Sequence, residues 1–223
     1  MTIENDKNNP DRSTTAALKR LIRLKWPETV GKASDRLSLI FSTGMTAIDT
    51  LFPQQGIPYG QLVEITGAPS SGKTSLLLKI MAAPAWHGRV VYIDLSRSFF
   101  PAAAAACGVD MDRLLTINPT SMPGALHAAG LLLSNNLSTC VAIDLVGQRE
   151  TMPIVMLHRL RLKTSRARGM VIFLTENNSG IIPPSTVALR LHVALKNEHS
   201  LTVTVTKSRI SREGTTAEVS LNA

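Results

Sequence analysis

The sequence predicts an α/β fold in which a mostly parallel β-sheet is flanked by helices and carries antiparallel strands at its C-terminal edge. Short continuous apolar runs, typical of strands buried on both faces, alternate with helical segments along most of the chain. A glycine-rich turn between a predicted strand and a predicted helix occurs at 67–74. Beyond residue 186, apolar and polar residues nearly alternate on both sides of KNEHS, which indicates a hairpin.

The first 38 residues are predicted to form a polar tail followed by a basic amphipathic helix. The segment AALKRLIRLKW at 16–26 places leucine and isoleucine at helical spacing among lysine and arginine. Its apolar stripe could pack on the rest of the chain or dock onto a neighbouring subunit, a partner or nucleic acid. Residues 39–223 are expected to form one domain, because a chain of this size can bury a full core.

Within 39–223 the elements follow from the apolar pattern. Strands are predicted for QLVEITG, RVVYIDL, the short segment 114–117, STCVAID and MVIFLTE. Helices are predicted for SLLLKIMAA, PAAAAACG, ALHAAGLLL and MPIVMLHRLRLKTSR. The hairpin pairs VALRLHVAL with LTVTVTKSR, and a last strand lies near AEVSL.

Composition restricts the possible partners and compartment. The formal net charge of +8 favours polyanionic partners, because neutralising phosphates releases counterions. An aromatic content of 4% argues against a surface built for base stacking. No apolar run approaches the roughly 20 residues of a membrane-spanning helix, and the polar start MTIENDKNNPDRSTT lacks the apolar core of a secretory signal. The chain is therefore expected to be cytoplasmic, without membrane contact.

The glycine-rich turn fits the phosphate-loop pattern GxxxxGK[ST] without a mismatch. Its residues, with the serine that follows, are Gly67, Ala68, Pro69, Ser70, Ser71, Gly72, Lys73, Thr74 and Ser75. The glycines let successive amides face phosphate oxygens, and the next helix adds its positive end. Lys73 is expected to neutralise the β- and γ-phosphates, and Thr74 to bind Mg²⁺. The alternative is a plain turn before a helix; the strand–turn–helix context favours ATP and Mg²⁺.

Three acidic residues end predicted strands, at the sheet edge where ligands of open α/β sheets bind. Asp144 closes the apolar run CVAI and is the candidate second magnesium residue, the alternative being a capping aspartate. Asp94 ends YID and either lies beside the γ-phosphate or caps the next helix. Glu176 ends VIFLTE.

An ordered set of segments resembles the RecA/RadA recombinase superfamily. STGMTAIDTLFPQQGIPYGQLVEITGAPSSGKTSLLLKI is similar to the family's approach to its phosphate loop, and VVYIDLSRSFFP, AAACGVDMDRLL, VAIDLVG and VIFLTEN continue the resemblance in the same order. The resemblance runs from about residue 39 to 221. It implies a RecA-like P-loop NTPase core that assembles head to tail, binds ATP near the subunit interface and holds DNA, single strands above all, by two loops.

The resemblance also implies roles for particular residues. Asp144 matches the Walker B position, and Lys207 with Arg209 match a basic pair that reaches a neighbour's nucleotide. Ser96 stands where the family has the glutamate that activates water; a serine hydroxyl is a poor base, so hydrolysis should be weak unless Asp94 or another carboxylate substitutes. Glu176 stands at the position of a γ-phosphate-sensing glutamine.

The regions of the two DNA loops are short in this sequence. Residues 145–152 leave little chain before the next helix, and ENNSGIIPPST is stiffened by proline. Between them, HRLRLKTSRAR at 158–168 is either a solvated helix face or a stripe facing DNA or a partner. With Arg149, Lys207 and Arg209 it could share the carboxyl edge of the sheet.

Three functions remain as hypotheses from the sequence. The first is a DNA repair or recombination protein that binds ATP and DNA, self-associates and hydrolyses ATP weakly. The second is an accessory protein of ImuA type, which binds ATP to set assembly and recruits a translesion polymerase in the DNA damage (SOS) response. The third, an unrelated small-molecule kinase, is disfavoured because no lid-like arginine cluster follows the core motifs.

Overall fold

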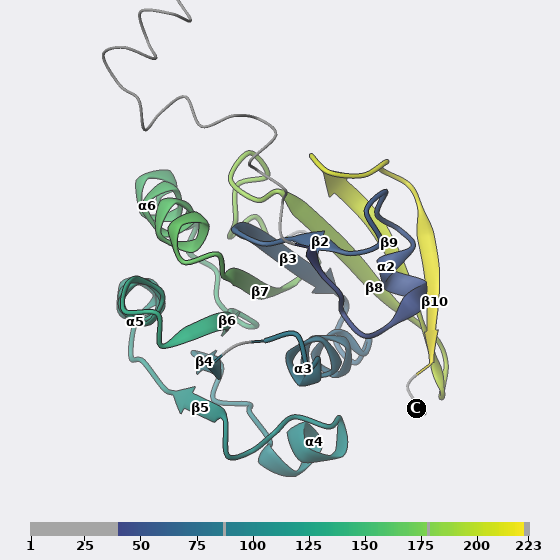
Figure 1. Ribbon diagram of the computed structural model, residues 1–223, viewed down its shortest axis with the longest axis horizontal. Coiled ribbons are helices and arrows are strands. Elements are labelled where there is room, and N and C mark those ends of the chain that lie inside the picture. Colours follow the sequence, from purple (N-terminus) through teal and green to yellow (C-terminus); the bar gives the residue numbers. More distant parts are fainter. Residues whose placement is uncertain (1–39, 87, 178, 221–223) are drawn as a thin grey trace, which may run out of the picture. The chain divides into compact units, whose positions relative to one another are not determined.

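The computed structural model describes residues 40–220 apart from His87 and Asn178. The basic helix predicted at 16–26 lies outside the described residues. Residues 40–220 contain an eight-stranded sheet in the order β10-β9-β8-β3-β7-β6-β4-β5, with helices on both faces (Figure 1). This is the predicted α/β architecture.

Six neighbouring strands of the sheet run parallel, and the last two strands of the chain pair antiparallel at one edge. The parallel strands are β3 (Gln61–Gly67), β4 (Arg89–Asp94), β5 (Leu114–Ile117), β6 (Ser138–Asp144), β7 (Met170–Glu176) and β8 (Leu189–Asn197). The antiparallel pairs are β8 with β9 (Ser200–Ser208) and β9 with β10 (Thr216–Ser220). The predicted hairpin is thus confirmed, and its first strand extends the parallel sheet.

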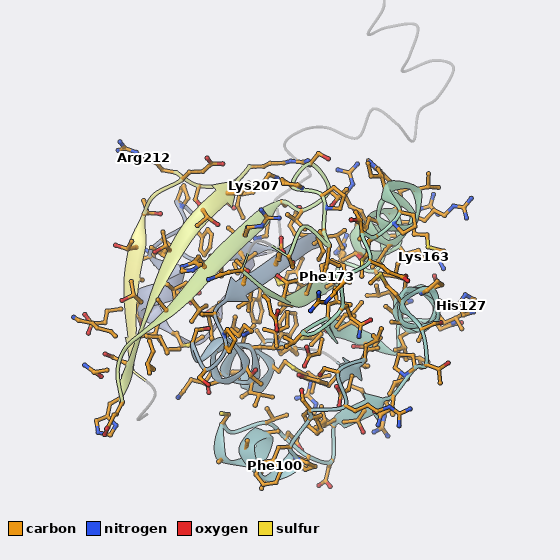
Figure 2. All side chains as sticks on the ribbon, turned by 180° about the vertical axis from the view of Figure 1, so that it is seen from behind. Phe100, His127, Lys163, Phe173, Lys207 and Arg212 are labelled. Carbon is orange, nitrogen blue, oxygen red and sulfur yellow. The ribbon has the colours of Figure 1, made fainter. Side chains whose placement is uncertain are left out.

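The helices cover the sheet in two groups. On one face α3 (Lys73–Ala82) packs against β3, β8 and β9 through leucine, isoleucine and valine side chains. On the other face α5 (Met122–Ser134) and α6 (Ile154–Arg166) cover β4, β6 and β7. Phe173 lies in this second core, while Lys163 and His127 extend from the outer helices (Figure 2). Strands buried on both faces explain the continuous apolar runs of the sequence.

The remaining helices and strands are short. The helix α4 (Pro101–Ala106) begins at its proline, as predicted. The helix α2 (Thr46–Asp49) and a small antiparallel pair, β1 (Ile40–Phe41) with β2 (Ile57–Pro58), were not predicted. Two-residue strands and a single helical turn carry too little periodic signal to be recognised in a sequence. None of the described helices is long and apolar enough to cross a bilayer.

Candidate functional site

The glycine-rich loop joins β3 to α3, as the motif requires. Ser70 and Gly72 take left-handed backbone conformations with φ of 57° and 82°, and Lys73 is the first residue of α3. The ammonium of Lys73 folds back over the loop, and its Nζ donates a hydrogen bond of 2.9 Å to the carbonyl of Ala68. The loop therefore closes around its own lysine at a helix N-terminus, an arrangement that binds anions.

The interior of the loop contains a polar atom without a partner. Ser71 is 5% exposed. Among the buried side-chain oxygens and nitrogens of the described residues, its Oγ alone has no hydrogen-bond partner. A buried hydroxyl in this condition is costly, and a phosphate oxygen would satisfy it. Gly67 is required here, because a Cβ at this position would overlap with Ser71 Oγ. The residues present therefore fit a bound phosphate group.

Gly72 is a loop position at which a side chain should harm folding for two reasons. Its φ of 82° disfavours any L-residue, and an added Cβ would run into the side chain of Leu201. We expect Gly72→Ala to lower the free energy of unfolding by about 1–2 kcal/mol. Urea denaturation checks this value, with Gly147→Ala as the control for positive φ alone, because nothing lies within 4 Å of the Cβ there. Equal losses for both variants would contradict a role for Leu201.

Two carboxylates meet at the carboxyl ends of β4 and β6. Asp94 and Asp144 are register neighbours on these parallel strands, and both are almost fully buried. Asp94 holds the loop that follows β4: it accepts hydrogen bonds from the amides of Ser98 (3.2 Å) and Phe99 (3.0 Å). These bonds hold the loop before α4 and do not cap the helix itself, whose N-cap residue is Phe100.

Ser96 lies between the two carboxylates. Its Oγ is 2.9 Å from Asp94 Oδ1 and 2.9 Å from Asp144 Oδ2, and it is 2.6 Å from Ser98 Oγ. The position that resembles the family's catalytic glutamate thus has a hydroxyl that is occupied by hydrogen bonds. Toward the two carboxylates Ser96 is a hydrogen-bond donor, and a serine hydroxyl is itself a poor base at neutral pH.

The side chain of Asp144 is fixed from several sides. Its Oδ2 accepts a hydrogen bond of 2.8 Å from the hydroxyl of Tyr92, and its Oδ1 accepts one of 2.9 Å from the amide of Val146. Burial, and then the charge of Asp144, raise the pKa of Tyr92, so this phenol remains a donor at all ordinary pH values. Tyr92 holds Asp144 in one orientation at the sheet edge.

Glu176 ends the strand beside the phosphate loop. It is the register partner of Gly67, and the amide of Asn177 donates a hydrogen bond of 3.2 Å to the carbonyl of Gly67. Burial lowers the pKa of Lys73, while the charges of Glu176 and then Asp144 act in the opposite direction. The charges of both carboxylates, which end the neighbouring strands β7 and β6, therefore act on Lys73.

Lys207 and Arg209 do not join this site in the same chain. Lys207 pairs in register with Arg190 on β8, whose neighbour on β3 is Glu64, three residues before Gly67. Three residues of strand are about 10 Å, so the pair lies toward the amino ends of the parallel strands. Lys207 appears at the same end of the C-terminal strands as Arg212 (Figure 2). The prediction that Lys207 and Arg209 share the carboxyl edge of the sheet with the phosphate loop of the same chain is therefore wrong.

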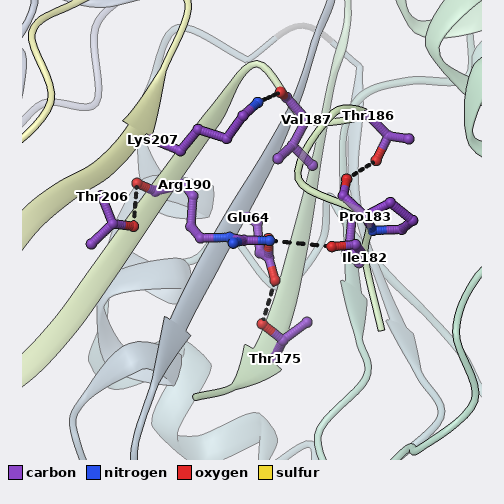
Figure 3. A network of polar contacts seen from close by, with 9 residues as sticks. All are labelled: Glu64, Thr175, Ile182, Pro183, Thr186, Val187, Arg190, Thr206 and Lys207. Atoms are coloured by element: carbon purple, nitrogen blue, oxygen red, sulfur yellow. Dashed lines mark hydrogen bonds and ion pairs between the residues drawn. The ribbon is translucent and has the colours of Figure 1, made fainter. Parts of the chain in front are cut away.

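Instead, three cations hold the loop between β7 and β8, which we call the second loop (177–188). Arg190 donates to the carbonyl of Ile182 (3.2 Å), Lys207 donates to the carbonyl of Val187 (2.6 Å), and Arg209 donates to the carbonyl of Ser185 (Figure 3 shows the first two). Burial, and then the charges of Arg209 and Arg190, lower the pKa of Lys207. These three side chains fix the course of the second loop.

An ion pair between the buried Glu64 and the partly exposed Arg190 lies under the second loop. Glu64 Oε2 is 2.6 Å from Arg190 Nε, and Glu64 Oε1 accepts a hydrogen bond of 2.8 Å from Thr175 (Figure 3). The sequence signal for this pair is a single charged residue in each of the strand segments LVEIT and LRLHV. Neither residue was predicted to belong to an ion pair. Tyr92 was missed as well, although it lies two residues before Asp94, on the same face of one strand.

The two loops that the resemblance assigns to DNA lie next to one another. The amide of Met152, at the end of the first loop (145–153), donates a hydrogen bond of 2.8 Å to the carbonyl of Ile181 in the second loop. Both isoleucines of the second loop, Ile181 and Ile182, are buried. The loops are therefore joined and anchored at the same side of the sheet.

Comparison with known proteins agrees with this geometry. Residues 28–151, more than half of the chain, match the family described as the RecA N-terminal domain, and the segment includes the phosphate loop, Asp94 and Asp144. The chain is 31% identical over 196 residues to protein RecA of Chloroflexus aurantiacus, which is 79% of this chain and 56% of that protein. It is 38% identical over 119 residues to protein RecA of Roseiflexus castenholzii, covering 52% of this chain and 34% of the relative.

The chain spans about half the length of the curated relatives that match it over the longest stretch. The crystal structure of the RadB recombinase is similar in fold, with a TM-score of 0.64 and 18% identity, over 80% of this chain and 94% of RadB. The family match covers the strand, loop and helix around Lys73 and reaches past Asp144. On these grounds the chain is a member of the RecA/RadA recombinase superfamily, with a RecA-like α/β core.

Proposed function

We propose that this chain is a RecA-like DNA repair or recombination protein that binds ATP with Mg²⁺, binds DNA, self-associates and hydrolyses ATP weakly. The observation that carries the nucleotide part is the unpartnered, buried Ser71 hydroxyl inside a loop that closes on Lys73. Gly67 to Ser75 hold the triphosphate in this proposal, and Thr74 with Asp144 hold the hydrated magnesium ion. The metal, when bound, neutralises charge on the phosphates.

Weak hydrolysis follows from the residues at the carboxyl ends of β4 and β6. Asp144 already accepts hydrogen bonds from Tyr92 and from the serine hydroxyls of the 95–99 loop. Ser96 offers no base, and the oxygens of Asp94 accept hydrogen bonds from the 95–99 loop. The loss of a positioned base typically costs about 10²- to 10⁴-fold in rate.

Removal of the loop lysine is the direct test of nucleotide binding. We expect Lys73→Ala to weaken binding of ATP with Mg²⁺ at least about tenfold, because a charge-assisted contact to the phosphates is lost. Titration calorimetry measures this, with Lys196→Ala as control: Lys196 is exposed and pairs with Glu218 on the C-terminal strands. Wild-type protein that takes up no ATP at millimolar concentration would contradict the proposal.

DNA binding is proposed for the joined loops together with the basic residues of α6. Arg166 and Arg168, at the end of α6 and just before β7, lie toward the amino ends of the strands, away from the first loop. Arg159, Arg166 and Arg168 are exposed, whereas Lys163 is partly buried and donates to the carbonyl of Gly130. Each phosphate contact adds roughly 0.7 to 0.9 to the slope of log affinity against log salt. Lys207 and Arg209 can serve a neighbour's nucleotide only by leaving the carbonyls of the second loop.

The occupied hydroxyl at Ser96 also favours a second function, an ImuA-type accessory protein that uses ATP for assembly and recruits a translesion polymerase. Measurement of ATP turnover with and without single-stranded DNA, on wild type and Lys73→Ala, separates the two. Turnover that DNA stimulates and the substitution abolishes supports the repair ATPase. ATP binding without turnover, together with self-association or partner binding, supports the accessory protein.

A further inference from the structure

Glu176 is a carboxylate at the edge of the nucleotide site, and no described residue forms an ion pair with it. Its strand position is beside Gly67, the first residue of the phosphate loop, and the next amide, of Asn177, is hydrogen-bonded to the Gly67 carbonyl. Within the described part of the chain, its side chain has neither a hydrogen bond nor an ion pair. It is also partly exposed, so its charge is available to a ligand.

The surroundings of Glu176 do not supply a counter-charge. The residue lines a cavity of about 400 Å³ under the second loop, together with Glu64, Thr66 and Arg190. Among the described residues that line this cavity, Arg190 is the one lysine or arginine. Its Nε is already paired with Glu64 Oε2 at 2.6 Å. The negative charge of Glu176 therefore remains uncompensated on the cavity side.

On its other side, Glu176 acts on Lys73. Its charge favours the protonated ammonium of Lys73, and does so more strongly than the charge of Asp144. In a phosphate loop this lysine reaches the β- and γ-phosphates. Because Glu176 is the register neighbour of Gly67, where the phosphate loop begins, its carboxylate also lies beside the site of the phosphates and repels their negative charge.

We propose that Glu176 sets the nucleotide preference of the site, disfavouring the terminal phosphate of ATP so that ADP binds at least as tightly as ATP. This inference rests on the proposed nucleotide binding. ADP has one phosphate fewer and less negative charge near Lys73, so the repulsion is smaller. The chain then remains nucleotide-bound after ATP is consumed, instead of releasing ADP for ATP.

The test compares variants that differ only in this charge. Dissociation constants for ATP and for ADP, each with Mg²⁺, are measured by titration calorimetry on wild type, Glu176→Gln, Glu176→Ala and the control Asp112→Asn. Asp112 is exposed just before β5, at the opposite end of the parallel strands from the phosphate loop. We expect both Glu176 variants to shift the ratio toward ATP by about tenfold, while ADP binding changes by less than about threefold.

Several outcomes would overturn the proposal. A wild-type preference for ATP of about tenfold or more would do so, as would an unchanged ratio in both variants. A shift in Glu176→Gln without one in Glu176→Ala would mean that a new amide hydrogen bond, and not lost repulsion, is responsible. Absence of binding for both nucleotides in wild type would instead refute the proposed function. Thermal unfolding of each variant confirms that it is folded.

Discussion

Ser96→Glu is expected to raise ATP turnover by about 10²-fold. The substitution puts a carboxylate where a serine hydroxyl now contacts Asp94 and Asp144, and a positioned base is typically worth about 10²- to 10⁴-fold. The lower end applies, because the new carboxylate is repelled by two others. The 95–99 loop should keep its course, since the amides of Ser98 and Phe99 still bind Asp94.

Steady-state phosphate release with saturating ATP and Mg²⁺ measures this gain. Ser96→Ala, which removes the hydroxyl without adding a base, should remain at the wild-type rate, and Ser96→Glu combined with Lys73→Ala should lose the gain. Equal rates for Ser96→Glu and Ser96→Ala would show that the missing glutamate is not what limits hydrolysis.

Glu64→Ala should destabilise the fold by about 3 kcal/mol. The substitution leaves the guanidinium of Arg190 without its carboxylate and the hydroxyl of Thr175 without its acceptor, under the second loop. Removing the buried partner costs more than the pair itself contributes, because the other charge stays behind, here on an arginine side chain that is 24% exposed. Urea unfolding monitored by circular dichroism gives the change.

The control is the exposed pair of Lys196 and Glu218, whose Nζ to Oε2 distance of 2.7 Å is nearly the same. Glu218→Ala should leave the free energy of unfolding almost unchanged, because water screens an exposed pair. The double variant Glu64→Leu with Arg190→Met should recover much of the lost stability, since neither partner then remains charged. A loss as small as that of Glu218→Ala would mean that water reaches the Glu64 carboxylate.

The sheet was predictable because its signal is local. Apolar runs and turn residues gave the bounds of the strands at 114–117, 138–144 and 170–176 as the structure has them. The phosphate loop was predictable for the same reason, since its geometry is carried by eight consecutive residues. The position of Asp144 beside Asp94 was predictable because the carboxyl ends of parallel strands lie at one edge.

The rest depends on contacts between residues far apart in the chain. Strand order and register decide that Tyr92 contacts Asp144 and that Lys207 contacts the carbonyl of Val187. A single sequence does not give strand order or register. The position of Lys207 shows this most clearly. The direction of β9, antiparallel to β8, carries the basic pair away from the phosphate loop.

The three cations on the second loop have a consequence for its encounter with other molecules. The carbonyls of this loop accept hydrogen bonds from arginine and lysine, and its isoleucines are packed in the core. Such a segment has lost most of its conformational freedom during folding. Little further entropy is lost when a ligand arrives, so recognition there is of rigid-body type and depends on complementary shape.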